Sequence, residues 1–212
     1  MGVTTMRRWG TALAAIVLAS AGLAASVTTA NAAAPQAAKA GTDRDPIWGQ
    51  GTADPSCAPV WGSGDKTAEP TEYRPLENVR AGRHACFDRL VLDVRGSGDR
   101  KIGYRVGYVK ELRQDGSGDL IKVGGGAILE VRAAAPSYDP ETGTATYQGR
   151  AGQPLPGVNL AGYQTFKDAR FGGSFEGDTQ IGLGVRAKLP FRVTQTANHL
   201  IVDVAHSWTA TR

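Results

Sequence analysis

Residues 89–95 read Arg-Leu-Val-Leu-Asp-Val-Arg, and this short stretch indicates the fold class. Leu90, Leu92 and Val94 alternate with polar and charged side chains. Successive side chains of a β-strand point to opposite faces of the sheet, so a period of two is typical of a half-buried strand. The Gly-Ser-Gly-Asp segment that follows at 96–99 is typical of a turn. We therefore expect a strand with one apolar face and one polar face.

The same alternation recurs through the second half of the chain. Further strands are predicted at residues 104–109, 127–133, 165–171, 179–186, 190–196 and 199–206. Frequent glycine turns separate them, and no long amphipathic helix interrupts them. This pattern predicts an all-β domain over residues 76–208, built as a β-sandwich or open barrel of short antiparallel strands. The His-Leu-Ile-Val-Asp-Val of 199–204 echoes 89–94, which two related halves or chance would explain equally well.

The first 32 residues have the three parts of a secretory signal peptide. Arg7 and Arg8 precede an apolar run over 12–25, and Ala-Asn-Ala at 30–32 is a typical cleavage site. The apolar run is shorter than the ~20 residues that a membrane-spanning helix needs. We therefore predict a secreted or envelope-located protein that has no membrane span after cleavage.

Residues 33–75 are rich in Ala, Pro, Gly, Thr and Asp and lack apolar periodicity. Such a segment buries too little surface to offset its ordering entropy, so it is predicted to be a flexible linker. Trp48 and Trp61 stand out within it. They are candidate partner-binding residues, although docking on the protein's own domain would also explain them.

Cys57 and Cys86 are the two cysteines of the chain. In an exported protein a cysteine pair is expected to form a disulfide. The bond would tie the tryptophan-bearing segment to the start of the predicted β domain.

The sequence lacks the motifs of the common secreted hydrolases and metalloenzymes. It contains no G-x-S-x-G and no H-E-x-x-H, and its three histidines are widely spaced. Asp93 and Asp203 lie in matching strands, where structural hydrogen bonding is a better explanation than a catalytic carboxylate pair. A net charge of +4 is too small for a dedicated nucleic-acid binder. We expect no catalytic residues, no metal and no cofactor.

A binding surface remains as the expected functional feature. The candidate ligand-binding residues are Arg89, Arg95, Tyr104, Tyr108 and Arg192. Arginine forks recognise carboxylates and phosphates, and exposed tyrosines would stack on sugar rings. The two tyrosines would equally suit the core. These residue types point to peptidoglycan or another cell-wall polymer as the ligand.

Six segments together resemble a known family. They are Cys86–Val94, Tyr104–Val109, Phe175–Gly177, Ile181–Arg186, Leu189–Val193 and Leu200–His206. The set resembles the AMIN-like domain of exported actinobacterial proteins, a distant relative of the amidase N-terminal (AMIN) domain, over roughly residues 76–208. The resemblance implies a β-sandwich without catalysis of its own. In the broader family such domains direct amidases and secretin components to peptidoglycan or the septum.

The resulting expectation is a secreted, non-catalytic module that binds a cell-wall polymer. Two alternatives stay open at this point. One is an adaptor that binds an envelope protein through the tryptophan-bearing N-terminal segment, and the other is a secreted hydrolase of an unrecognised class.

Overall fold

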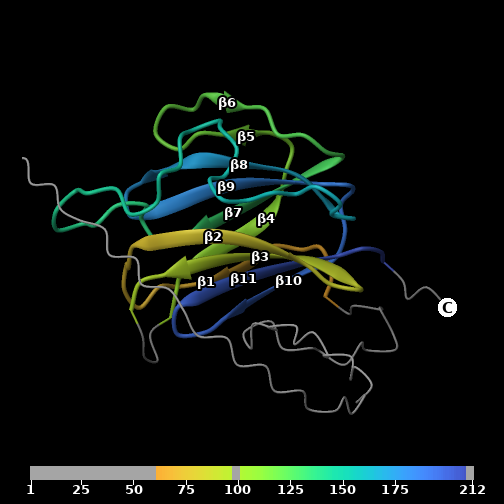
Figure 1. The fold of residues 1–212 in the computed structure, drawn as a ribbon, viewed down its shortest axis with the longest axis horizontal. Helices are drawn as coiled ribbons and strands as arrows, with labels where there is room; N and C mark the ends of the chain where they lie inside the picture. Colours follow the sequence, from red (N-terminus) through yellow and green to blue (C-terminus); the bar gives the residue numbers. More distant parts are fainter. Residues whose placement is uncertain (1–60, 97–100, 209–212) are drawn as a thin grey trace, which may run out of the picture. The chain divides into compact units, whose positions relative to one another are not determined.

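Strands alone form the regular secondary structure of residues 61–96 and 101–208, the part of the chain that the computed structural model describes. The strands are β1 (Lys66–Ala68), β2 (Leu76–Arg83), β3 (Phe87–Val94), β4 (Tyr104–Val109), β5 (Leu112–Arg113), β6 (Leu120–Ile121), β7 (Ala127–Ala133), β8 (Phe166–Phe175), β9 (Asp178–Val185), β10 (Phe191–Gln195) and β11 (His199–Ala205). Figure 1 shows their arrangement. The expected all-β class is confirmed. Within these residues no helix has the length and apolarity to cross a membrane.

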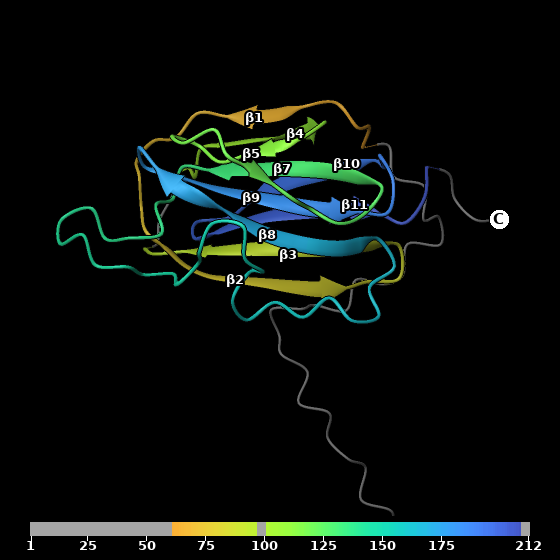
Figure 2. The ribbon, with the colours of Figure 1, turned by 90° about the horizontal axis from the view of Figure 1, so that it is seen from above.

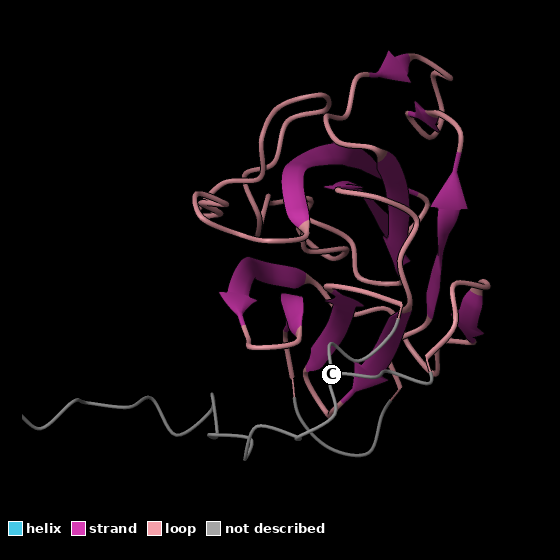
Figure 3. Ribbon diagram, turned by 90° about the vertical axis from the view of Figure 1, so that its right-hand side faces the viewer, coloured by secondary structure: helices cyan, strands magenta, loops and turns pink. Residues whose placement is uncertain are grey.

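The strands form two main antiparallel sheets and one small hairpin. The five-stranded sheet has the order β1-β4-β7-β9-β8, and the four-stranded sheet has the order β10-β11-β3-β2. The hairpin pairs β5 with β6. Figure 3 shows the two sheets as separate layers, and in the view from above in Figure 2 the five-stranded sheet lies over the four-stranded sheet. The described strands form no closed barrel, and the two sheets share one core, which agrees with the expected sandwich or open barrel.

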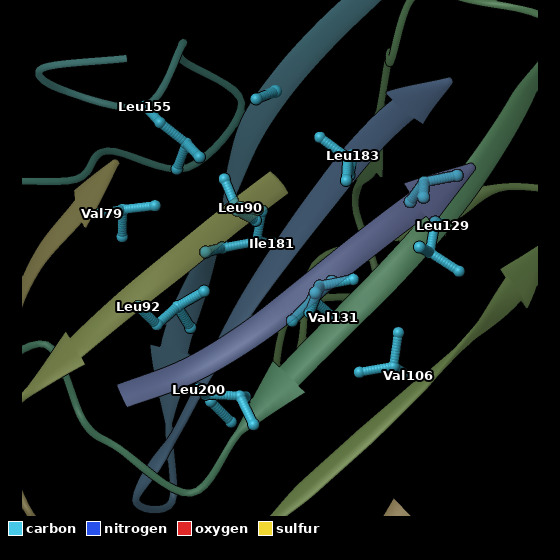
Figure 4. Packing of buried hydrophobic residues seen from close by; sticks show 14 of the residues in the cluster. Val79, Leu90, Leu92, Val106, Leu129, Val131, Leu155, Ile181, Leu183 and Leu200 are labelled. Carbon is cyan, nitrogen blue, oxygen red and sulfur yellow. The ribbon is translucent and has the colours of Figure 1, made fainter. Parts of the chain in front are cut away.

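One hydrophobic core joins the inner faces of the two sheets. Leu90, Leu92 and Leu200 of the four-stranded sheet belong to the same buried cluster as Leu129 and Ile181 of the five-stranded sheet (Figure 4). The alternation read in residues 89–95 therefore has the predicted consequence, because the apolar face of β3 packs against the opposite sheet.

The two echoing segments of the sequence are neighbours in the four-stranded sheet. β3 and β11 pair antiparallel, with His199 opposite Asp93 and Asp203 opposite Arg89. An antiparallel register turns the similar sequences end to end. It therefore places an acidic residue of each strand opposite a basic residue or histidine of the other.

The domain begins earlier than the sequence pattern suggests. β1 lies inside the segment that was predicted as a linker, and it pairs with β4 at the edge of the five-stranded sheet. Arg74 is buried and donates to the carbonyls of Arg95 and Ala197. The linker prediction is therefore wrong for residues 61–75. The rest of the predicted linker, and the predicted signal peptide, lie outside the described residues.

The β5–β6 hairpin and the loop after it cover part of the outer face of the five-stranded sheet. This close approach requires glycine on β9. A Cβ at Gly182 would overlap the side chain of Leu112, and a Cβ at Gly184 would overlap the carbonyl oxygen of Gly124. Glycine at these positions thus leaves room for the Leu112 side chain in one case and for the backbone of Gly124 in the other.

Candidate ligand-binding surface

A row of three charged residues crosses the outer face of the four-stranded sheet. The register places Arg192 of β10 opposite Asp203 of β11, and Asp203 opposite Arg89 of β3. Residues directly opposite each other in neighbouring strands have side chains in contact range. The sheet therefore sets one carboxylate between two guanidinium groups.

Asp203 is the centre of this row. Its carboxylate accepts hydrogen bonds from Arg89 Nε at 2.6 Å and Nη2 at 2.9 Å, and from Arg192 Nε at 2.8 Å. The Asp203 side chain is only 1% exposed, whereas those of Arg89 and Arg192 are 20% and 42% exposed. Three charge-assisted hydrogen bonds hold a buried carboxylate between two arginines that reach solvent.

Each of the two arginines also makes a cation–π contact with an aromatic ring. The guanidinium carbon of Arg192 lies 4.4 Å from the ring centroid of Trp61, and that of Arg89 lies 5.2 Å from the centroid of Phe87. The two rings meet edge to face with centroids 5.6 Å apart. We call Trp61, Phe87, Arg89, Arg192 and Asp203 the arginine–aromatic surface.

Trp61 is held in place by the edge of the sheet. The amide of Phe191 in β10 donates to the carbonyl of Gly62 at 2.9 Å, which fixes the backbone next to Trp61. Gly62 has a φ of 65°, a conformation that favours glycine. Trp61 thus packs on the protein's own domain, the second of the two explanations that the sequence leaves open for it.

The surface leaves hydrogen-bond donors available. Arg192 uses only Nε in a hydrogen bond within the described part of the chain, which leaves the N–H groups of both terminal nitrogens for another partner. At the same end of the sheet His84 stacks on Phe87, with ring centroids 4.4 Å apart. Burial, followed by the nearby positive charge of Arg89, lowers the pKa of His84. With two arginines around one aspartate, this region has more positive than negative formal charge.

The other candidate ligand-binding residues lie elsewhere. Arg95 forms exposed ion pairs with Glu77 at 2.9 Å and Asp139 at 2.7 Å. The hydrogen bond from Arg95 lowers the pKa of the Asp139 carboxyl. The structure therefore brings Arg89 and Arg192 together and places Arg95 in a separate ion-pair group.

The two candidate tyrosines belong to the five-stranded sheet. Tyr108 donates its hydroxyl to the carbonyl of Leu189 at 2.8 Å and accepts from the amide of the same residue at 2.9 Å. Burial raises the pKa of Tyr108. Both Tyr104 and Tyr108 pack against the core. Tyr108 therefore ties β4 to the loop that precedes β10, and neither tyrosine lies beside Arg89 and Arg192.

The predicted cysteine and tryptophan roles are only partly within the described residues. Trp48 and Cys57 lie outside them. Cys86 is described, at the turn between β2 and β3, and it is not a free thiol. The Cys57–Cys86 disulfide stays a prediction.

A network of buried hydrogen bonds links the start of β8 to the end of β11. Asp88 accepts hydrogen bonds from the amides of Thr165 at 2.6 Å and Phe166 at 3.0 Å. The hydroxyl of Thr165 is 2.9 Å from Nδ1 of His206, whose Nε2 lies 3.0 Å from the carbonyl oxygen of His84. An acid, an imidazole and a hydroxyl thus lie together, but Thr165 is fully buried. A hydroxyl that no substrate can reach serves the fold.

The two matching aspartates also serve the sheet. Asp93 accepts two hydrogen bonds from Arg80 Nε and one from Arg80 Nη2, and it lies 3.4 Å from His199. Asp203 is held by Arg89 and Arg192 as described above. Both aspartates therefore make the structural hydrogen bonds that were expected of them. Among the described residues no group of three or more His, Cys, Asp or Glu side chains is arranged to hold a metal ion.

Comparison with known proteins gives one match. The family model of the AMIN-like domain matches residues 74–206. No curated protein and no solved structure matches the chain. The match begins two residues before β2, and it includes Phe87, Arg89, Arg192 and Asp203 of the arginine–aromatic surface.

Proposed function

Because this chain belongs to the AMIN-like domain family, we propose that it is a cell-envelope binding module that works outside the cytoplasm and without catalysis. Its proposed ligand is an anionic wall polymer, with peptidoglycan as the first choice. The proposed binding site is the arginine–aromatic surface, through which the guanidinium groups would hold carboxylate or phosphate groups of the polymer.

The exposed guanidinium of Arg192 carries this proposal. It is fixed by a buried carboxylate on one side and by an indole ring on another, and its terminal nitrogens point to no partner within the described residues. An arginine that is already ordered loses less conformational entropy when it binds an anion. Its planar fork matches a carboxylate or a phosphate in a bidentate geometry.

The aromatic rings have a supporting role in this proposal. Trp61 lies against Arg192, so one of its faces is already used by a cation. We therefore assign recognition to charge and hydrogen bonding, with the rings orienting the arginines. Binding through exposed charges is screened by salt, so retention on the polymer should fall as ionic strength rises.

Retention on purified cell wall tests the proposal. The wild-type protein, Arg192→Gln and the control variant Arg150→Gln are incubated with wall fragments and sedimented at physiological salt. Arg150 is exposed and lies on a loop away from the surface. Loss of a hydrogen bond between charged groups is worth about 1.5–3 kcal/mol, so Arg192→Gln should weaken retention by roughly tenfold or more. Arg150→Gln should leave it unchanged.

Retention on two wall preparations, untreated and stripped of phosphate, identifies which anionic group of the wall is bound. Walls stripped of phosphate-containing polymers by acid keep the carboxylates of peptidoglycan. Undiminished retention on stripped walls assigns the carboxylates, whereas loss of retention assigns the phosphate polymer. If the wild-type protein is not retained on either wall, or if both variants behave alike, the proposed binding site is wrong. Capture of a specific envelope protein without wall binding would instead favour the adaptor.

A further inference from the structure

The five-stranded sheet carries a hollow of about 480 Å³ on the other side of the domain. It lies between β1, β4 and the turn that joins β8 to β9. The charged and tyrosine residues of its lining are Asp65, Glu69, Tyr73, Tyr104, Arg105, Arg132 and Asp178. We call it the β4 hollow. Its size is within the range of sites that hold small molecules or short peptides.

Two arginines lie opposite each other in this hollow. The strand register forms a row across the sheet in which Thr67 of β1 is opposite Arg105 of β4, and Arg105 is opposite Arg132 of β7. Like charges directly opposite each other in neighbouring strands are destabilising. A charge pair of this kind indicates that something must compensate the positive charge.

The domain itself compensates only one of the two. Arg132 donates to Asp115 at 2.5 Å and to Glu130 at 3.2 Å, and these carboxylates raise its pKa against the opposing effect of burial. Arg105 is exposed and forms no ion pair with any described residue. A positive charge is therefore left available in the lining of the hollow.

Carboxylates line the same hollow without neutralising that charge. Asp65, Glu69 and Asp178 form no ion pair within residues 61–96 and 101–208. Burial is the main cause that raises the pKa of Asp178, against the opposing effect of the nearby positive charge of Arg132. Separate charges of both signs, in one hollow but not joined to each other, match a ligand that carries both signs itself.

A strained turn builds the rim beside these charges. Glu176 has a φ of 49° and Gly177 a φ of 90°, so two successive residues adopt left-handed conformations. Such a turn matches the twist of a hairpin but is unfavourable for glutamate. A Cβ at Gly177 would lie 2.8 Å from Cδ1 of Tyr73, so the ring packs closely on the turn. Tyr73 is 52% exposed yet held in position.

From this arrangement we propose that the β4 hollow binds a short zwitterionic peptide. Arg105 holds the terminal carboxylate, the carboxylates of Glu69 and Asp178 receive the terminal ammonium group, and the ring of Tyr73 contacts the peptide between its ends. This binding site is separate from the arginine–aromatic surface and goes beyond the proposed wall binding.

Titration with trialanine, followed by two-dimensional NMR of the backbone amides, tests this proposal. Trialanine with free termini should shift signals of the hollow and few others. Trialanine amide lacks the carboxylate and N-acetyl trialanine lacks the ammonium group, so each should bind about tenfold more weakly, as expected for loss of one charge-assisted contact. Titration to about 10 mM reaches near-saturation for a Kd of 1 mM.

Two variants separate this site from the other surface. In Arg105→Gln the free and amidated peptides should bind equally weakly, because the group that distinguishes them is gone. Arg192→Gln should bind trialanine as the wild type does, and Arg105→Gln should still be retained on cell wall. Absence of shifts in the hollow, or an Arg105→Gln variant that still prefers the free carboxylate, would overturn the proposal. Neither result bears on wall binding, which depends on Arg192.

Discussion

Replacing Asp203 by asparagine is a direct test of the charged row on the four-stranded sheet. The substitution keeps the size of the side chain but removes its charge. It also turns one acceptor oxygen into an NH₂ donor that must face an arginine N–H, since Arg89 and Arg192 donate to both oxygens. The two guanidinium groups would then lie near each other without the carboxylate that separates them.

The magnitude follows from the burial of the three side chains. Removing one partner of a fully buried ion pair costs about 3–5 kcal/mol. Arg89 and Arg192 retain 20% and 42% exposure, so water would compensate part of the loss. We expect the free energy of unfolding to fall by about 2 kcal/mol, the value of one hydrogen bond between charged groups. For a domain of this size that corresponds to a melting temperature lower by roughly 4–8 °C.

Thermal unfolding followed by circular dichroism measures the effect, with Glu77→Gln as the matched control. Glu77 and its partner Arg95 are 49% and 47% exposed. Exposed ion pairs contribute about 0–1 kcal/mol, so the control should change the melting temperature little. If Asp203→Asn is no less stable than Glu77→Gln, the row does not stabilise the sheet and our account of the surface is refuted.

Three further predictions concern the fold and its stability. Gly184→Ala should prevent stable folding, because a Cβ there would overlap the backbone of Gly124. The control Gly64→Ala should change the melting temperature little, since a Cβ at Gly64 meets no atom within 4 Å. Equal effects of the two variants in circular dichroism would contradict the close approach of this loop to β9. Burial lowers the pKa of His84 from 6.5, so the unfolded state binds the proton first and the free energy of unfolding should fall as pH decreases below about 6.5. Urea denaturation at a series of pH values measures this dependence, and His84→Gln should flatten it. A variant with the same pH dependence as the wild type would exclude the effect. If Cys57 and Cys86 form the predicted disulfide, mass spectrometry after alkylation should find no free thiol in the oxidised protein. Reduction should then lower the free energy of unfolding by roughly 3–4 kcal/mol for a loop of about 30 residues. Full alkylation without reduction would disprove the bond.

The sequence predicts the β class well because periodicity is a local property. Leu90, Leu92 and Val94 alternate within one strand, and the burial of each follows from that strand alone. The echo between the segments at 89–94 and 199–204 also has a structural counterpart, since these strands are neighbours. Their adjacency was not predicted, because strand order depends on which long-range pairs bury the most surface, and short strands of similar composition offer many such pairings.

The candidate sites were harder to predict for a related reason. Arg89 and Arg192 were identified as candidates, but their common partner Asp203 is defined by the register of three strands that are distant in sequence. Trp61 lies in a stretch without apolar periodicity, and its packing depends on Phe87, on Arg192 and on a backbone hydrogen bond between Gly62 and β10. Tyr104 and Tyr108 carry the alternation of a strand, and that alternation cannot distinguish a core position from the wall of a hollow.

The pairing of β3 with β11 has a consequence for how this domain comes into existence. Arg89 and its partner Asp203 are 114 residues apart. During synthesis β3 leaves the ribosome long before β11 has been translated, so β3 can pair with β2 on one edge while its other edge has no partner. Folding that depends on such distant contacts is slow. A nascent chain halted before residue 199 would lack a central strand, and quality-control proteases would meet it as an unfolded polypeptide.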